Sequence, residues 1–139
     1  MNIFFNLNPF PSLFVYNLFA ATILRIAVAI VFVYIAQYMY EHRAEISNVR
    51  FPIIGTPKRW MLLLSAGVTL LTAFFLFVGL DTQCAAIVGI VIAIKHAFIP
   101  KQFASLTPFG RSTYILLVVI CISLMLLGGG RLAFDYPML

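Results

Sequence analysis

Four long runs of apolar residues, separated by short polar segments, dominate the chain. They extend over residues 17–40, 60–80, 82–99 and 112–129. A helix needs about 20 mostly apolar residues to cross the roughly 30 Å of hydrocarbon in a bilayer. None of the runs alternates apolar and polar residues as the strands of a membrane barrel do. The pattern therefore predicts an all-α protein, an integral membrane bundle of four transmembrane helices.

The prolines support these boundaries, because proline removes a helical hydrogen bond and clashes with the preceding turn. All seven lie outside the four runs, at positions 9, 11, 52, 57, 100, 108 and 137. The third run is short, and Lys95 and His96 lie near its end. A re-entrant hairpin is the alternative to a full crossing there, although a lysine at this depth can extend its ammonium group to the membrane surface.

The composition leads to the same expectation. Of the 139 residues, 63% are hydrophobic and 9% are charged, against roughly 25% charged residues in soluble domains. A soluble fold of this length would leave much of that apolar surface in water. We expect one membrane domain over residues 1–139 and no nucleic-acid partner, because the basic residues form no stripe on a soluble surface. Cys84 and Cys121 have neither redox nor zinc spacing and are interpreted as buried apolar thiols.

The basic residues predict the orientation. The first and third loops carry most of them, namely Arg43, Arg50, Lys58 and Arg59 in the first and Lys101 and Arg111 in the third. Cytoplasmic loops are enriched in Lys and Arg, so both loops are placed in the cytoplasm and both termini outside. Tyr38, Tyr40, Trp60 and Tyr114 would then lie at the inner interface, where membrane proteins concentrate aromatic rings.

Small residues predict how the helices pack, since they permit close approach of two backbones in lipid. Four of them recur at a spacing of four in the third run: Ala85, Gly89, Ala93 and Ala97. The second run has Ser65, Thr69 and Ala73 at the same spacing. We expect these two faces to meet; the alternative is that the first stripe mediates formation of a homo-oligomer.

Arg25 is the most informative polar residue, because it lies about two turns inside the first run. A charge there costs at least ~2.5 kcal/mol unless it is paired or hydrated, and such residues commonly face the interior and have a function. Asp81 and Asp135 lie at the same side of the membrane in the predicted topology. Arg25 is thus either a ligand-binding group, for example for a quinone oxygen, or one partner of a structural ion pair.

Lys95, His96 and Arg131 are weaker candidates for a binding site. A histidine beside a lysine near an interface is more often a solvated anchor than a ligand. The only other histidine, His42, lies in the first loop, so neither a haem nor a metal site is expected. The four carboxylates of the chain all lie near the ends of the runs and form no hydrolytic pair.

Three segments resemble the DoxX family of small bacterial membrane proteins. Residues 79–86 read G-L-D-T-Q-C-A-A, residues 24–32 read L-R-I-A-V-A-I-V-F, and residues 128–135 read G-G-G-R-L-A-F-D. The resemblance covers nearly the whole chain, and it depends on the order and spacing of these segments together. A His-Gly pair, a lysine and a glutamate that are common in the family are replaced here by Ile35 and Ala36, Met39, and Thr69 or Thr72.

The resemblance implies a four-helix protein of the bacterial cytoplasmic membrane that is linked to respiratory or thiol redox metabolism. It implies an accessory membrane subunit rather than a stand-alone enzyme, with a quinone as ligand and an oxidoreductase as partner. Two alternatives remain open. A scaffold or assembly factor would bind partners without a cofactor, and a small transporter would give flux in liposomes.

Overall fold

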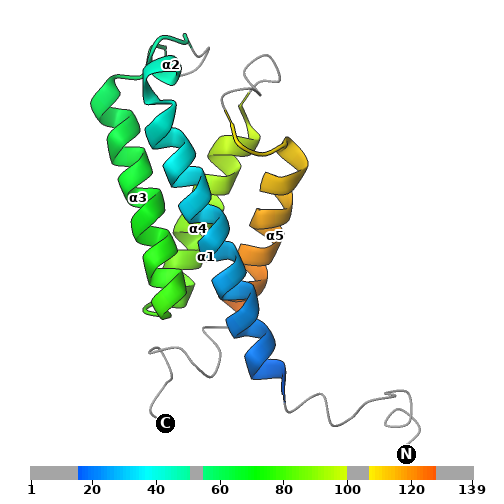
Figure 1. The fold of residues 1–139 in the computed structure, drawn as a ribbon. Helices are drawn as coiled ribbons and strands as arrows, with labels where there is room; N and C mark the ends of the chain where they lie inside the picture. Colours follow the sequence, from blue (N-terminus) through cyan, green and yellow to red (C-terminus); the bar gives the residue numbers. More distant parts are fainter. Residues whose placement is uncertain (1–15, 51–54, 100–106, 128–139) are drawn as a thin grey trace, which may run out of the picture.

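The computed structural model describes residues 16–50, 55–99 and 107–127, and most of these residues are in helices. The helices are α1 (Asn17–Glu41), α2 (Arg43–Ser47), α3 (Arg59–Val78), α4 (Thr82–Ala97) and α5 (Arg111–Leu127) (Figure 1). Within these ranges no β-strand occurs. The expected all-α class is therefore confirmed, and each of the four apolar runs corresponds to one long helix.

Local sequence explains where the helices end. Pro57 precedes the extended residue Lys58, which caps the start of α3, and Pro108 lies in the turn before α5. Gly79 closes α3 in the left-handed conformation, with φ of 80°, and its N–H donates a hydrogen bond of 2.8 Å to the Phe75 carbonyl. Glycine adopts this conformation without the steric cost that a Cβ atom brings.

The short helix α2 was not predicted. Chain direction changes at His42, whose Nδ1 and backbone N–H both lie near the Tyr38 carbonyl, at 3.1 and 3.0 Å. Ile46 is buried, so one apolar side chain holds this polar segment against the end of the long helices. A single buried residue is too weak a pattern for a five-residue helix to be recognised in the sequence.

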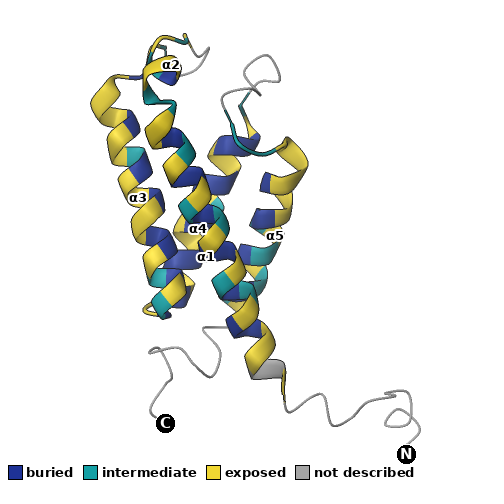
Figure 2. Ribbon diagram, viewed as in Figure 1, coloured by how far each residue is buried: buried dark blue, intermediate teal, exposed yellow. Residues whose placement is uncertain are grey.

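The four long helices pack side by side (Figure 1). The most extensive contacts are those of α1 with α3 and of α4 with α5; α3 also contacts α4, and α1 also contacts α5. Phe32 and Ile35 of α1 fill the centre together with Leu76 of α3 and Leu124 of α5, and all four side chains are fully buried. Each long helix thus contributes one face to a common apolar core (Figure 2).

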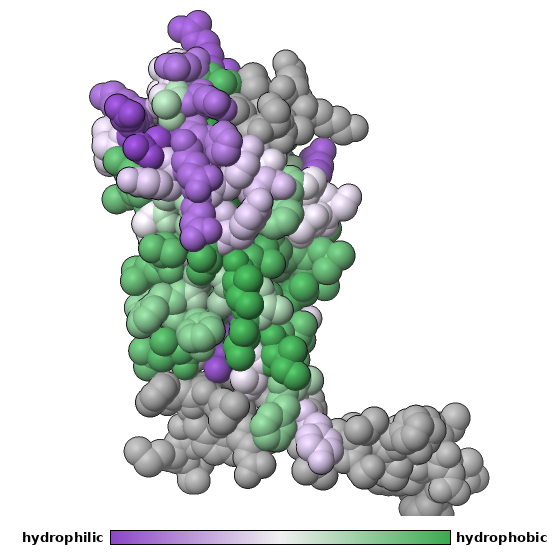
Figure 3. Space-filling view, viewed as in Figure 1, coloured by the Kyte–Doolittle hydropathy of each residue, from purple (hydrophilic) through white to green (hydrophobic). Residues whose placement is uncertain are grey.

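The opposite faces of the helices are also apolar. Large hydrophobic side chains are exposed along α3, α4 and α5, for example Leu64, Phe74, Val91 and Leu116. The side drawn in Figure 3 has hydrophilic residues around α2 and a hydrophobic belt below them. By length and composition, α1 (over Phe19–Glu41) and α3 can cross a membrane, whereas α4 and α5 are apolar but shorter.

The small residues of α4 are all buried, and α4 contacts α3 as expected, but the nearest neighbours of Gly89 come from two other helices. A Cβ atom built on Gly89 would lie 3.1 Å from the Phe32 ring of α1 and 3.3 Å from Cys121 Sγ of α5. The stripe at this point therefore receives side chains of α1 and α5. The cysteine prediction also needs correction, because Cys121 is buried and Cys84 is exposed in the first turn of α4.

Candidate functional site

Arg25 lies inside the core of the protein. Its side chain is 2% exposed and is among the largest fully buried side chains. Buried threonines accompany it in the apolar core: Thr22, Thr69, Thr72 and Thr82. Asp81 is exposed at the turn between α3 and α4, with φ of 45°. Asp135 and Arg131 lie outside the described residues, so the expected approach of Asp135 to Arg25 stays a prediction.

His96 is buried, and its interpretation as a solvated anchor was wrong. The residue is 5% exposed because it lies on the face of α4 that packs against α5. Its ring stacks on Tyr114 with a centroid distance of 5.3 Å and an angle of 18° between the planes. The ring atom Nδ1 lies 2.8 Å from the Ile92 carbonyl. Since a carbonyl can only accept, Nδ1 carries the hydrogen, and Nε2 is the acceptor of the neutral ring.

Lys95, the neighbour of His96, points to α3. Its Nζ donates a hydrogen bond of 2.5 Å to Ser65 Oγ, which joins the two helices 30 residues apart in sequence. Ser65 is half-buried and Lys95 is exposed. The position agrees with a lysine whose alkyl stem lies along apolar surface while its ammonium group reaches a polar partner.

A cavity of about 230 Å³ opens beside Lys95 and His96. We call it the Lys95 cavity. Its lining comes from α1, α2, α3 and α4 and the segments next to them: Met39, Ile46, Pro57, Met61, Leu62, Ser65, Lys95, His96, Ile99 and Thr107. Most of the wall is apolar, and the polar atoms belong to Ser65, Lys95, His96 and Thr107. This is the usual composition of a site for a small apolar molecule with a few polar atoms.

A second cavity, of about 380 Å³, lies at the start of α5. We call it the Tyr114 cavity. Its lining residues are His96, Ile99, Thr107, Pro108, Phe109, Gly110, Arg111 and Tyr114. The two cavities share His96, Ile99 and Thr107, so His96 stands in the wall between them.

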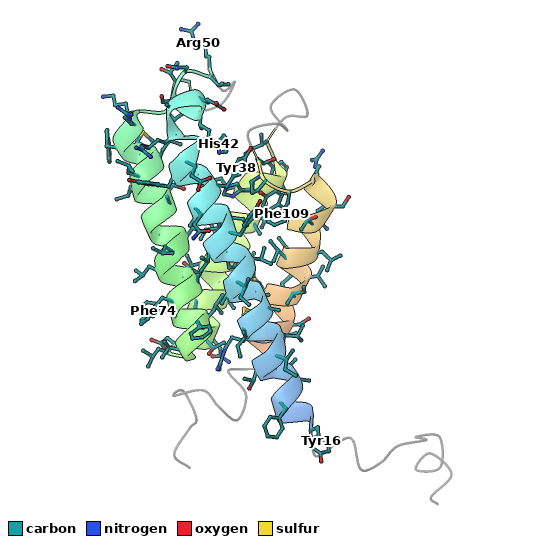
Figure 4. The ribbon with its side chains drawn as sticks, in the orientation of Figure 1. Tyr16, Tyr38, His42, Arg50, Phe74 and Phe109 are labelled. Carbon is teal, nitrogen blue, oxygen red and sulfur yellow. The ribbon has the colours of Figure 1, made fainter. Side chains whose placement is uncertain are left out.

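Aromatic rings surround this end of the molecule. In Figure 4, Tyr38, His42 and Phe109 lie where the end of α1 approaches the beginning of α5. Tyr38 stacks on His42 at 4.1 Å, and Phe109 meets Tyr114 edge-on at 6.4 Å. Tyr114 is only 1% exposed. The sequence predicted Tyr114 at the inner membrane interface and missed that its side chain belongs to a buried site.

A third hollow, a groove of about 850 Å³, runs between α1 and α3. Its wall is apolar except for Gln37 and Tyr34; the other lining residues are Ala29, Ile30, Val33, Leu70, Leu71, Ala73, Phe74 and Phe77. Phe74, labelled in Figure 4, points outward from α3. Such a groove is suited to hydrocarbon chains and offers few groups for chemistry.

The site has no metal-binding character in the described part of the chain. No group of three or more His, Cys, Asp or Glu side chains that could hold an ion occurs there. Comparison of the chain with protein-family models, curated proteins and solved structures finds no match. The chemistry of the two cavities is therefore the main basis for a function.

Proposed function

We propose that the protein is an integral membrane protein whose four long helices, α1, α3, α4 and α5, all cross the bilayer. The exposed apolar faces of these helices support the proposal, because lipid is the solvent in which such faces are stable. The described parts of α4 and α5, with 16 and 17 residues, are about 24 and 26 Å long at 1.5 Å per residue. Local thinning of the bilayer accommodates spans that are a few ångströms short.

The basic end of the protein faces the cytoplasm in this proposal. The segment around α2 and the starts of α3 and α5 carry Arg43, Arg50, Lys58, Arg59 and Arg111, and the hydrophilic cap in Figure 3 covers the α2 end. The turn between α3 and α4, with Asp81, is then outside. The rule that positive residues remain in the cytoplasm supports this choice.

The function we propose is that of an accessory membrane subunit that binds a quinone in the Lys95 cavity. The observation that carries the proposal is the arrangement of this cavity, with an apolar wall and with Lys95, His96 and Ser65 at its polar side. A quinone has an apolar chain and carbonyl oxygens that accept hydrogen bonds. Lys95 Nζ is a donor, and the Ser65 hydroxyl is a second one.

The resemblance to the DoxX family points to the same class of function. It suggests the bacterial cytoplasmic membrane as location and a quinone-linked oxidoreductase as partner. Our proposal moves the ligand from the outer half of the membrane, where Arg25 lies, to the cytoplasmic end. Arg25 then has a structural role in the core.

Calorimetric titration of the detergent-purified protein with a short-chain benzoquinone tests this proposal. We expect saturable binding, weakened about tenfold in Lys95→Met, because a hydrogen bond from a charged donor is worth about 1.5–3 kcal/mol. Lys58→Met is the matched control, since it removes an exposed lysine at the same end of the molecule. Quinone binding that is absent, or equally weak in both variants, would overturn the proposal.

A further inference from the structure

The Tyr114 cavity has features that a site for an apolar molecule does not need. The Tyr114 hydroxyl is buried, and its hydrogen has no acceptor among the described residues; the Phe109 backbone N–H can only donate to its oxygen. A buried O–H group without an acceptor costs about 1–3 kcal/mol. A polar ligand in the cavity that this side chain lines would remove that cost.

The charges around the cavity favour an anion. Arg111 lines it, and α5 begins at this residue with no acidic residue in its first turn. The first N–H groups of a helix have no partners within the helix, and the helix dipole attracts negative charge to them. No carboxylate belongs to the described residues of the cavity wall, so nothing there repels an anion.

Space for the ligand comes from Gly110. A Cβ atom built on this residue would meet no atom within 4 Å, so the backbone immediately before α5 is open. His96 forms the inner wall with its stacked ring. The combination of an arginine, a helix N-terminus and a buried hydroxyl is suited to the tetrahedral oxygens of a phosphate group.

We propose that the Tyr114 cavity binds a phosphate group, with the Tyr114 hydroxyl donating to one phosphate oxygen and Arg111 and the α5 N-terminus balancing the charge. The phosphate is either that of a lipid headgroup or free phosphate from the cytoplasm. This site is separate from the proposed quinone site, on the other side of His96, and does not depend on it.

Native mass spectrometry of the full chain in detergent provides the test. Phosphatidic acid and diacylglycerol with the same acyl chains are added to the protein in separate samples. We expect retention of phosphatidic acid to exceed that of diacylglycerol at least about tenfold, as for ligands that differ by charge-assisted hydrogen bonds. If the two lipids were retained equally, the phosphate would not be recognised and the proposal would be wrong.

Variants assign the binding to the cavity. Tyr114→Phe keeps the ring that stacks on His96 and is expected to reduce retention of phosphatidic acid about fivefold or more. Tyr40→Phe removes the hydroxyl of an exposed tyrosine near the end of α1. We expect it to leave the retention of phosphatidic acid unchanged. Equal behaviour of the two variants would overturn the assignment. Matching circular dichroism spectra establish that both variants are folded.

Inorganic phosphate distinguishes the two sources of the ligand. If millimolar inorganic phosphate displaces phosphatidic acid from the wild-type protein but not from Tyr114→Phe, the site accepts free phosphate. If phosphatidic acid stays bound to the wild-type protein in the presence of inorganic phosphate, while Tyr114→Phe releases it, the site is specific for a lipid headgroup. Both results support a phosphate site at Tyr114, whereas displacement that is the same in both proteins contradicts it.

Discussion

Gly89 is the residue where the packing is tightest. Phe32, the nearest neighbour of its missing Cβ atom, is fully buried and has little room to move. We expect Gly89→Ala to destabilise the protein by about 1–2 kcal/mol, because the cost of overpacking exceeds the gain in helix propensity. The control is Gly67→Ala on α3, where a Cβ atom meets nothing within 4 Å; this variant should be neutral or slightly more stable.

Thermal unfolding in detergent, followed by circular dichroism, compares these two glycine variants. A lower Tm for Gly89→Ala than for Gly67→Ala is expected. The same Tm for both would mean that α1 and α5 do not meet α4 as closely as described.

Arg25 leads to a second prediction for a single residue. Its side chain is large and buried, so Arg25→Ala leaves a cavity and is expected to cost about 2–4 kcal/mol of stability. Arg25→Met keeps most of the volume and removes a charge from the apolar core, and should be less harmful. Quinone affinity should be unchanged in both variants. A loss of quinone affinity in Arg25→Met, with stability retained, would return the ligand site to Arg25.

At the scale of the helices, the sequence predicted most of what is seen. A run of about 20 apolar residues leaves few alternatives to a helix, so the limits of α1 and α3 agree with prediction to within two residues. The contact between His96 and Tyr114 could not be predicted, because they belong to different helices and the angle at which α4 faces α5 depends on packing. Gly89 had the right spacing for close approach, but spacing alone does not identify the partner.

The turn between α3 and α4 allows a prediction for an element. Gly79 ends α3 with positive φ, whereas no positive φ occurs at Gly110. We expect Gly79→Ala to lower stability by about 1 kcal/mol, the usual cost of a Cβ atom in the left-handed conformation, and Gly110→Ala to leave it unchanged. Chemical unfolding in detergent measures the difference. Equal stability of the two variants would show that the turn tolerates another backbone conformation.

For the whole molecule, the apolar belt and the basic end are the features that connect structure with function. A membrane explains why so many large hydrophobic side chains point away from the core. In the proposed orientation, the Lys95 and Tyr114 cavities lie near the cytoplasmic surface, where quinones and lipid headgroups can both reach them. In water the same surface would cause aggregation.

The proposed crossing of the membrane by every long helix is the basis of both proposed sites, and labelling of single cysteines tests it most directly. Asp81→Cys and Asn48→Cys, each in a Cys84→Ala background with Cys121 kept in the core, are treated with a membrane-impermeant maleimide in spheroplasts. We expect labelling of Asp81→Cys in intact spheroplasts and of Asn48→Cys only after permeabilisation. Labelling of both positions from the same side would contradict a membrane-spanning α3 and the orientation built on it.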